Sequence, residues 1–100
     1  MIKYSLQVSN RYLKDLKLAR KRGLDEQLLN DIIQKLLRGE ELPAKNRNHA
    51  LKGDYIGFWE CHITPDWLLI YQKNTTIKII SLFNYFNYFV AYLINFFCLL

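Results

Sequence analysis

The sequence predicts an α+β fold in which a two-helix hairpin packs on one face of a mostly antiparallel β-sheet. Three observations support this prediction. Apolar and polar residues alternate near the N-terminus, two stretches of helical periodicity follow, and strand-like patterns return from residue 49 onward. The chain of 100 residues is long enough for one domain and too short for two. We therefore expect an N-terminal strand, two helices, an antiparallel meander and an apolar C-terminal tail, for which a helix is one option.

The N-terminal half supplies the first strand and both helices. Residues 2–8 alternate with a period of two, which predicts a half-buried strand. Ser9 is a good N-cap for a helix over residues 10–22, whose last turn is basic and so complements the helix dipole. Asp25 is the expected cap of a second helix with a wide apolar stripe, which ends at Gly39. The short connection makes the two helices an antiparallel hairpin.

The second half of the chain predicts the meander. The strongly apolar stretch 67–71 is the candidate for the central strand. Pro, Asp, Asn and Thr at the intervening positions favour turns. The expected elements are a short strand or turn over 49–53, strands over 56–63, 67–71 and 76–80, and turns at 64–66 and 74–75.

The composition indicates a folded, basic protein. Hydrophobic residues make up 51% of the chain, and the 14 Lys and Arg against 9 Asp and Glu give a net charge of +5. That surplus fits a polyanionic partner, either nucleic acid or an acidic protein, and equally fits a solvated surface. Cys61 and Cys98 form no CxxC pair and have no zinc-finger spacing, so no disulfide is expected. The N-terminus lacks the hydrophobic stretch of a signal peptide, which predicts a cytoplasmic domain.

A break in charge divides the chain after Lys78. All 23 charged residues lie at or before it, and residues 79–100 carry none. We therefore expect a domain over residues 1–78 and an uncharged apolar tail over 79–100. The tail has the length of a membrane span, about 20 residues, but contains three Asn and is followed by no positive charge. Of its three explanations, a frameshifted gene end is favoured over a membrane anchor or a helix packed on the domain or a partner.

The residues suited to chemistry lie in the second half. No metal-binding box, P-loop or Gly-rich nucleotide motif is present, and the acidic residues are scattered, so no metal or other cofactor is expected. Metal-free RNA cleavage needs a base for the ribose 2′-OH, an acid for the leaving oxygen, and cations for the phosphorane charge. The candidates for proton transfer are His49, His62 and Asp66, and the candidates for contacting RNA are Lys45, Arg47, Lys52 and Trp67.

Each candidate also has a structural explanation. A single His at a strand end is more often a solvated or core residue than a catalytic one. Asp66 follows Thr-Pro and suits a turn, and Trp67 is more often a core residue than a platform for a base. These residues therefore form a site only if they meet at one edge of the sheet.

The ordered motifs resemble those of YafQ-type toxins in the RelE/ParE superfamily. Residues 48–53 read NHALKG and residues 57–71 read GFWECHITPDWLLIY, beside family patterns close to D-H-x-L-x-G and R-x-x-H-I-x-P-D-W-x-L-I-Y. The resemblance covers roughly residues 1–78 and implies a microbial-RNase-like fold. It further implies metal-free endonucleolytic cleavage of mRNA, usually on the translating ribosome, and neutralisation by a cognate antitoxin. By position, His49, His62 and Asp66 match catalytic or RNA-contacting residues, and Trp67 matches the aromatic residue beside them.

The C-terminal segment departs from that family. The usual ending resembles R-T-G-[ST]-H-x-x-L-F, whereas residues 77–86 read IKIISLFNYF and contain neither the Arg nor the His. Loss of a proton-transfer group commonly costs about 10²–10⁴-fold in rate. The expected function is therefore that of an mRNA-cleaving toxin that this ending impairs. The alternatives are an inactive module that only binds its antitoxin and, more weakly, a small membrane-anchored protein.

Overall fold

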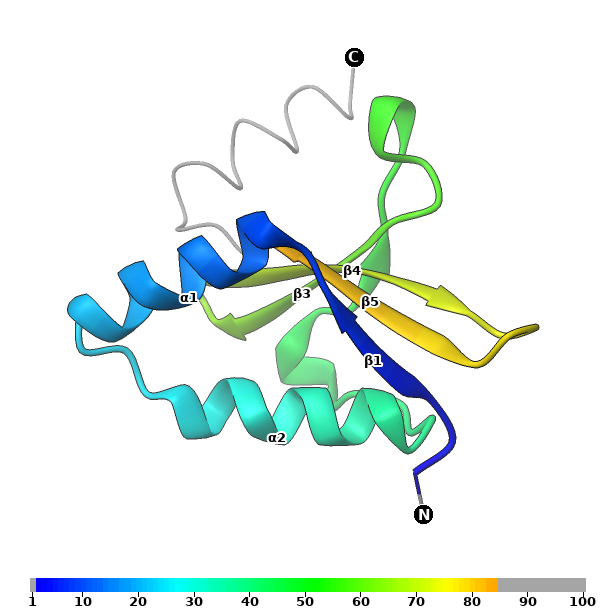
Figure 1. Ribbon diagram of the computed structural model, residues 1–100, viewed down its shortest axis with the longest axis horizontal. Coiled ribbons are helices and arrows are strands. Elements are labelled where there is room, and N and C mark those ends of the chain that lie inside the picture. Colours follow the sequence, from blue (N-terminus) through cyan, green and yellow to red (C-terminus); the bar gives the residue numbers. More distant parts are fainter. Residues whose placement is uncertain (1, 85–100) are drawn as a thin grey trace.

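The computed structural model describes residues 2–84, and within them the chain forms a mixed five-stranded sheet with two helices (Figure 1). The strand order is β1-β5-β4-β3-β2. Strand β1 runs parallel to β5, and the other neighbouring strands are antiparallel. The α+β class is thus confirmed. In chain order the elements are β1 (Ser5–Val8), α1 (Asn10–Lys21), α2 (Glu26–Leu37), the 3₁₀ turn η1 (Ala44–Asn46), β2 (His49–Ala50), the 3₁₀ turn η2 (Gly53–Tyr55), β3 (Trp59–Thr64), β4 (Trp67–Asn74) and β5 (Ile79–Asn84).

Both helices begin at the caps that the sequence predicts. The Ser9 hydroxyl accepts a hydrogen bond from the Tyr12 backbone N–H at 3.0 Å, and the Asp25 carboxylate accepts one from the Gln27 N–H at 3.0 Å. These bonds satisfy amide donors that a first helical turn otherwise leaves without partners. Gly39 follows α2 with a φ of +74°, in the left-handed region that glycine adopts without strain.

Strand β1 differs from the expectation of a half-buried strand. It is shorter than predicted, and all four of its residues are exposed. The reason is its position, because β1 is an edge strand whose only neighbour is β5, paired from Ser5↔Ile79 to Val8↔Leu82. An edge strand that the helices do not cover cannot bury either face.

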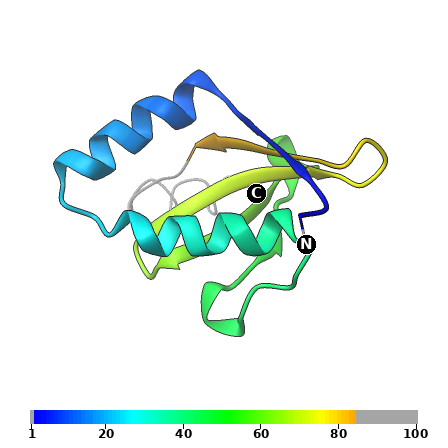
Figure 2. The same cartoon turned by 60° about the horizontal axis from the view of Figure 1, so that its bottom comes forward.

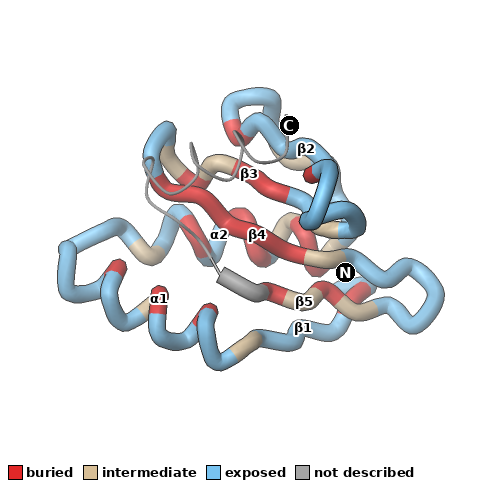
Figure 3. The backbone as a smooth tube through the Cα atoms, turned by 90° about the horizontal axis from the view of Figure 1, so that it is seen from above, coloured by how far each residue is buried: buried red, intermediate tan, exposed pale blue. Residues whose placement is uncertain are grey.

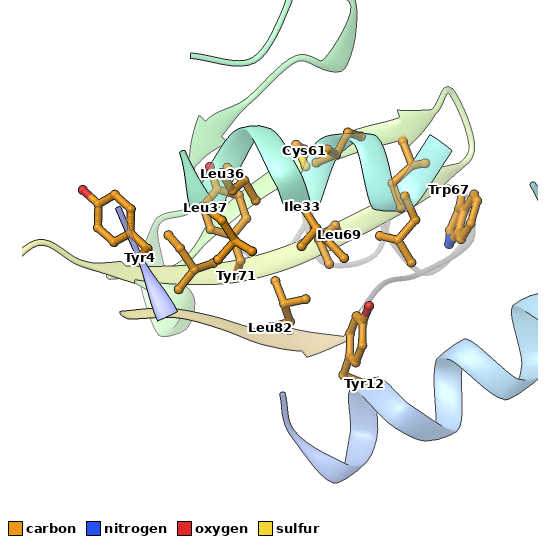
Figure 4. Packing of buried hydrophobic residues seen from close by; sticks show 14 of the residues in the cluster. Tyr4, Tyr12, Ile33, Leu36, Leu37, Cys61, Trp67, Leu69, Tyr71 and Leu82 are labelled. Atoms are coloured by element: carbon orange, nitrogen blue, oxygen red, sulfur yellow. The ribbon is translucent and has the colours of Figure 1, made fainter. Parts of the chain in front are cut away.

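The hydrophobic core lies between the helices and one face of the sheet. Figure 2 shows α2 lying across β3 and β4 on that face. Alternate residues of β4 point into this core, namely Trp67, Leu69 and Tyr71 (Figure 4). Helix α2 contributes Leu29 and Leu36 to the same core. The intervening residues of β4, Leu68 and Ile70, are buried as well, so β4 is buried along most of its length (Figure 3). The predicted central strand is thus confirmed.

Strand β5 occupies residues that were expected to belong to the apolar tail. The sequence placed the last strand at 76–80 and began an apolar tail at residue 79, but Ile79–Asn84 form β5 between β1 and β4. Ile80 and Leu82 are fully buried in the core. The turn is longer than expected because the Asn74 side chain accepts hydrogen bonds from the N–H groups of Thr76 and Ile77. The sheet therefore includes the first six residues of the expected tail, and residues 85–100 lie outside the described part of the chain.

Within residues 2–84, neither helix has the length and apolar character needed to cross a membrane. The anchor considered for the tail falls on residues that the structure does not describe.

Candidate active site

A buried carboxylate and an exposed imidazole face each other across the outermost strand pair. Strand β2 pairs with β3 so that His49 lies opposite Glu60, and opposed residues of an antiparallel pair point to the same face. The His49 Nε2 atom is 3.4 Å from Glu60 Oε1. The Glu60 side chain is 0% exposed, whereas that of His49 is 44% exposed. The pair thus reaches from the interior of the fold to solvent.

His62 approaches the same carboxylate oxygen. It follows Glu60 by two residues on β3, and side chains two apart on a strand share a face. Its Nε2 atom lies 4.0 Å from Glu60 Oε1, and its side chain is 15% exposed. Two imidazoles from neighbouring strands therefore converge on one buried oxygen.

Backbone carbonyls orient both imidazoles. The Nδ1 atom of His49 lies 2.7 Å from the Arg47 carbonyl oxygen, and the Nδ1 atom of His62 lies 3.3 Å from the Pro65 carbonyl oxygen. A carbonyl oxygen can only accept, so Nδ1 carries the hydrogen in both rings. In this arrangement the Nε2 atom of each ring faces Glu60.

Burial shifts the pKa values of Glu60 and His62 in opposite directions. It raises the pKa of Glu60, an effect that the charge of His49 partly offsets. It also lowers the pKa of His62 below the usual value of about 6.5. The Pro65 carbonyl opposes that decrease, while the charges of Arg47 and His49 add to it. His62 is therefore a neutral imidazole at pH 7.

The loop before β2 is fastened to the strands that carry the site. Asn46, only 5% exposed, donates from its side-chain amide to the His62 carbonyl oxygen at 2.7 Å. Two residues later, the Asn48 side chain accepts a hydrogen bond from the Tyr71 hydroxyl at 2.6 Å. Neither residue stands out in the sequence, since an Asn in a loop before a strand has many other uses. Their contacts hold the loop beside His49 and His62.

The three expected cations are exposed and lie within six residues of His49 in the sequence, before and after β2. Lys45 lies in η1, Arg47 follows it, and Lys52 precedes η2. Arg47 has a φ of +46°, so the backbone turns sharply there before it enters β2. The charge of Arg47 also acts on the site, because it is one of the causes that lower the pKa of His62.

Asp66 lies beside this cluster without contacting either imidazole. It is exposed in the turn between β3 and β4, and its carboxylate accepts a hydrogen bond from the Thr64 hydroxyl at 3.0 Å. The preceding residue, Pro65, supplies the carbonyl that orients His62. Asp66 is thus a neighbour of His62 through the turn, and its direct partner is Thr64.

Trp67, an expected RNA contact, lies in the interior of the fold. Trp67 is 4% exposed and belongs to the hydrophobic core between the helices and the sheet. The packing role considered for this residue is the one that the structure shows.

Glu60 is the member of the cluster that sequence reasoning missed. Glu60 and His62 are polar residues two apart in a strand whose alternate positions, Cys61 and Ile63, are apolar. That alternation places both polar side chains on the face opposite the core. Cys61 is not available as a nucleophile, because burial raises the pKa of its thiol to about 12.

No group of three or more His, Cys, Asp or Glu side chains within residues 2–84 is arranged to hold a metal ion. What the arrangement offers is proton transfer: two imidazoles in different environments, one carboxylate between them, and cations beside them.

A mixed sheet backed by two helices, with paired histidines on the opposite face, has the RelE/ParE-like fold of small bacterial toxins. The family described as "Bacterial toxin of type II toxin-antitoxin system, YafQ" matches residues 4–85. The chain belongs to this YafQ family, as the motifs of residues 48–71 suggested.

Known relatives agree with this assignment. The mRNA interferase toxin YafQ of Escherichia coli K12 is 38% identical over 73 residues, which cover 72% of this chain and 79% of that protein. The YafQ in a solved E. coli DinJ–YafQ toxin–antitoxin complex is 30% identical, with a TM-score of 0.81 over 91% of this chain and 99% of that one. A metal-bound toxin from Helicobacter pylori is 32% identical, with a TM-score of 0.81 over 90% and 98% of the two chains.

Proposed function

We propose that this chain is an endoribonuclease that cleaves mRNA in the bacterial cytoplasm, without a metal ion, on the translating ribosome. The single observation that carries the proposal is the convergence of His49 and His62 on one rim of the sheet, on either side of Glu60. One imidazole is exposed at the end of the sheet, and the other is held neutral by burial. This is the separation of environments that an acid–base pair requires.

The reaction follows from these two environments. Neutral His62 takes the proton of the ribose 2′-OH at Nε2, and the 2′ oxygen attacks the adjacent phosphorus. His49 donates a proton from Nε2 to the departing 5′ oxygen. The products are an RNA end with a 2′,3′-cyclic phosphate and an RNA end with a 5′ hydroxyl. Each proton transfer of this type contributes about 10²–10⁴-fold to the rate.

The neighbouring residues position the RNA. Lys45, Arg47 and Lys52 are exposed around the loop before β2 and would meet phosphate oxygens, with the guanidinium suited to a two-point contact. The proposal includes Asp66 in the catalytic set, supported by its exposed carboxylate in the turn that orients His62. There it would accept a hydrogen bond from the ribose or pass on a proton.

The partners of this proposal are an mRNA on the ribosome and a cognate antitoxin. The net charge of +5 favours a polyanionic partner. The solved complex of YafQ with DinJ supports the second partner, since the toxin in it shares this fold.

A second candidate function is antitoxin binding without cleavage. It is favoured by the absence of charged residues from position 79 to the end of the sequence, which leaves the last strand without an Arg or His. Strand β5 instead presents Ser81, which donates a hydrogen bond to the Gln7 side chain. A serine cannot supply a permanent positive charge to a phosphate.

Induced expression in a bacterium, followed by primer extension on mRNA, separates the two candidates. We expect growth arrest with cuts inside coding sequences, both lost in His62→Ala. The matched control is Asn30→Ala on the exposed surface of α2. Intact mRNA and unimpaired growth at full protein level would reject cleavage. Co-purification with an antitoxin in that case would establish the second candidate.

A further inference from the structure

The Glu60 side chain has a position that packing does not explain. It is a fully buried carboxylate, and neither oxygen has a hydrogen-bond partner among residues 2–84. A buried charge without compensation is one of the most destabilising features that a fold can contain. The groups that compensate it are the two imidazoles, at 3.4 Å and 4.0 Å from the same oxygen.

The strand register makes this arrangement specific. His49 reaches Glu60 across the β2–β3 pair, and His62 reaches it along β3. From β4, the residue opposite Glu60 is the neutral Ile70. The titratable groups that face Glu60 within the described part of the chain are therefore the two histidines, and Arg47 is the further charge that acts on His62.

The hydrogen-bonding pattern of His49 places one proton between His49 and Glu60. Because Nδ1 of His49 donates to the Arg47 carbonyl, its Nε2 would present a lone pair to a carboxylate oxygen unless a proton lies between them. Imidazole is ordinarily the stronger base, so the proton belongs on Nε2. A second imidazolium 4.0 Å from the same oxygen would be repelled by the first, which favours neutral His62.

We propose that Glu60 is a positioning residue that keeps His49 protonated and aimed along the rim of the sheet, so that His49 is the acid and His62 the base. The proposal rests on the proposed function for its catalytic meaning. Its physical content, a carboxylate that sets the protonation of two imidazoles, stands independently of RNA cleavage.

The test uses Glu60→Gln, which keeps the shape of the side chain and removes its charge, and Glu60→Asp, which keeps the charge. Glu41→Gln is the matched control, since Glu41 is exposed in the loop before η1. NMR titration of the histidine rings in the purified protein, without RNA, follows each imidazole. The protonated fraction of His49 at pH 7 should fall in Glu60→Gln, recover in part in Glu60→Asp, and remain as in wild type in Glu41→Gln. An unchanged fraction in Glu60→Gln would overturn the proposal.

The pH dependence of RNA cleavage separates positioning from a merely structural role. The alkaline limb of the rate profile should move to lower pH by about one unit in Glu60→Gln, so that the loss of rate at pH 8 exceeds the loss at pH 6 by up to about tenfold. An equal loss at every pH would show that Glu60 acts only through the fold. If wild-type protein cleaves no RNA, the proposed function fails while the ring titration still decides the role of Glu60.

A measurement on the wild-type protein applies if Glu60→Gln does not fold. Carbon-13 labelling of the glutamate side chains reports the Glu60 carboxyl during the same titration. The Glu60 and His49 signals should share an inflection, because one proton lies between them. Independent inflections would contradict the proposal.

Discussion

The two ends of the sheet face that carries Glu60 differ sharply in charge. At the β2–β3 end, His49, Glu60 and His62 gather beside an exposed basic loop. Toward β5, a shallow groove of about 430 Å³ is lined by Gln7, Gln72, Ser81 and other residues, of which only Lys73 is charged. Gln72 follows Ile70 by two residues and so shares the face of Glu60. The comparison teaches that the titratable side chains are concentrated at one end of this face, while the other end offers mainly neutral hydrogen-bonding groups.

The largest expected effect comes from removing one group at each end. His62→Ala should lower the rate of RNA cleavage by about 10²–10⁴-fold, because it removes the base. Ser81→Ala, at the neutral end, should leave the rate within about tenfold of wild type, since it removes no titrating group. Single-turnover cleavage of ribosome-bound mRNA measures both. Equal losses in the two variants would remove the functional difference between the two ends.

A pair of Asn variants compares how rigidly each end is held. Asn46→Ala removes the donor to the partly buried His62 carbonyl and should lower the free energy of unfolding by about 1–3 kcal/mol, with a loss of cleavage. Asn74→Ala, in the exposed β4–β5 turn, removes acceptors of two N–H groups that water can reach and should cost less. Urea denaturation gives both values. A larger cost for Asn74→Ala would reverse the comparison.

The charge of the basic loop should appear in the salt dependence of RNA binding. Lys45→Gln removes one exposed cation and should reduce the slope of log affinity against log salt by about 0.7 if that lysine meets one phosphate of a single strand. Lys17→Gln, on the exposed surface of α1, is the control. A slope unchanged by Lys45→Gln would place the RNA away from this loop.

The smallest effect concerns the acid side of the pH profile. His62 acts as a base only when neutral, and burial lowers its pKa from the usual value. The rate should therefore rise with pH through an inflection below about 6.5 and be near its plateau at pH 7. Substituting Arg47 by Gln removes one cause of that lowered pKa, so the inflection should move to higher pH. Movement in the opposite direction would contradict the electrostatic account of His62.

Local sequence patterns predicted the parts of this fold that depend on local interactions. The caps at Ser9 and Asp25 act within three residues of themselves, and the apolar run of β4 reflects burial on both faces. The pairing of Ser5 with Ile79 joins residues far apart in the chain, and no local pattern indicates that β1 lies parallel at an edge. The extent of β5 was missed for a related reason, because the Asn74 side chain lengthens the turn before it.

In the candidate site, too, local motifs predicted some residues, whereas others depend on contacts between distant parts of the chain. The motif residues led to His49 and His62, but the carboxylate between them depends on the register of β2 against β3. For Trp67, the residue pattern favoured packing in the core, whereas the family resemblance suggested a contact with RNA. Side chains alternate along a strand, however, and β4 directs Trp67 into the core.

The central claim is that His62 is the base and His49 the acid of one cleavage reaction. Its most direct test uses ribosome-bound mRNA in which sulfur replaces the bridging 5′ oxygen at the cleavage site, because a thiolate leaves without being protonated. The account predicts that this substrate restores cleavage to His49→Ala and leaves His62→Ala inactive. Rescue of His62→Ala instead, or of both variants alike, would contradict it.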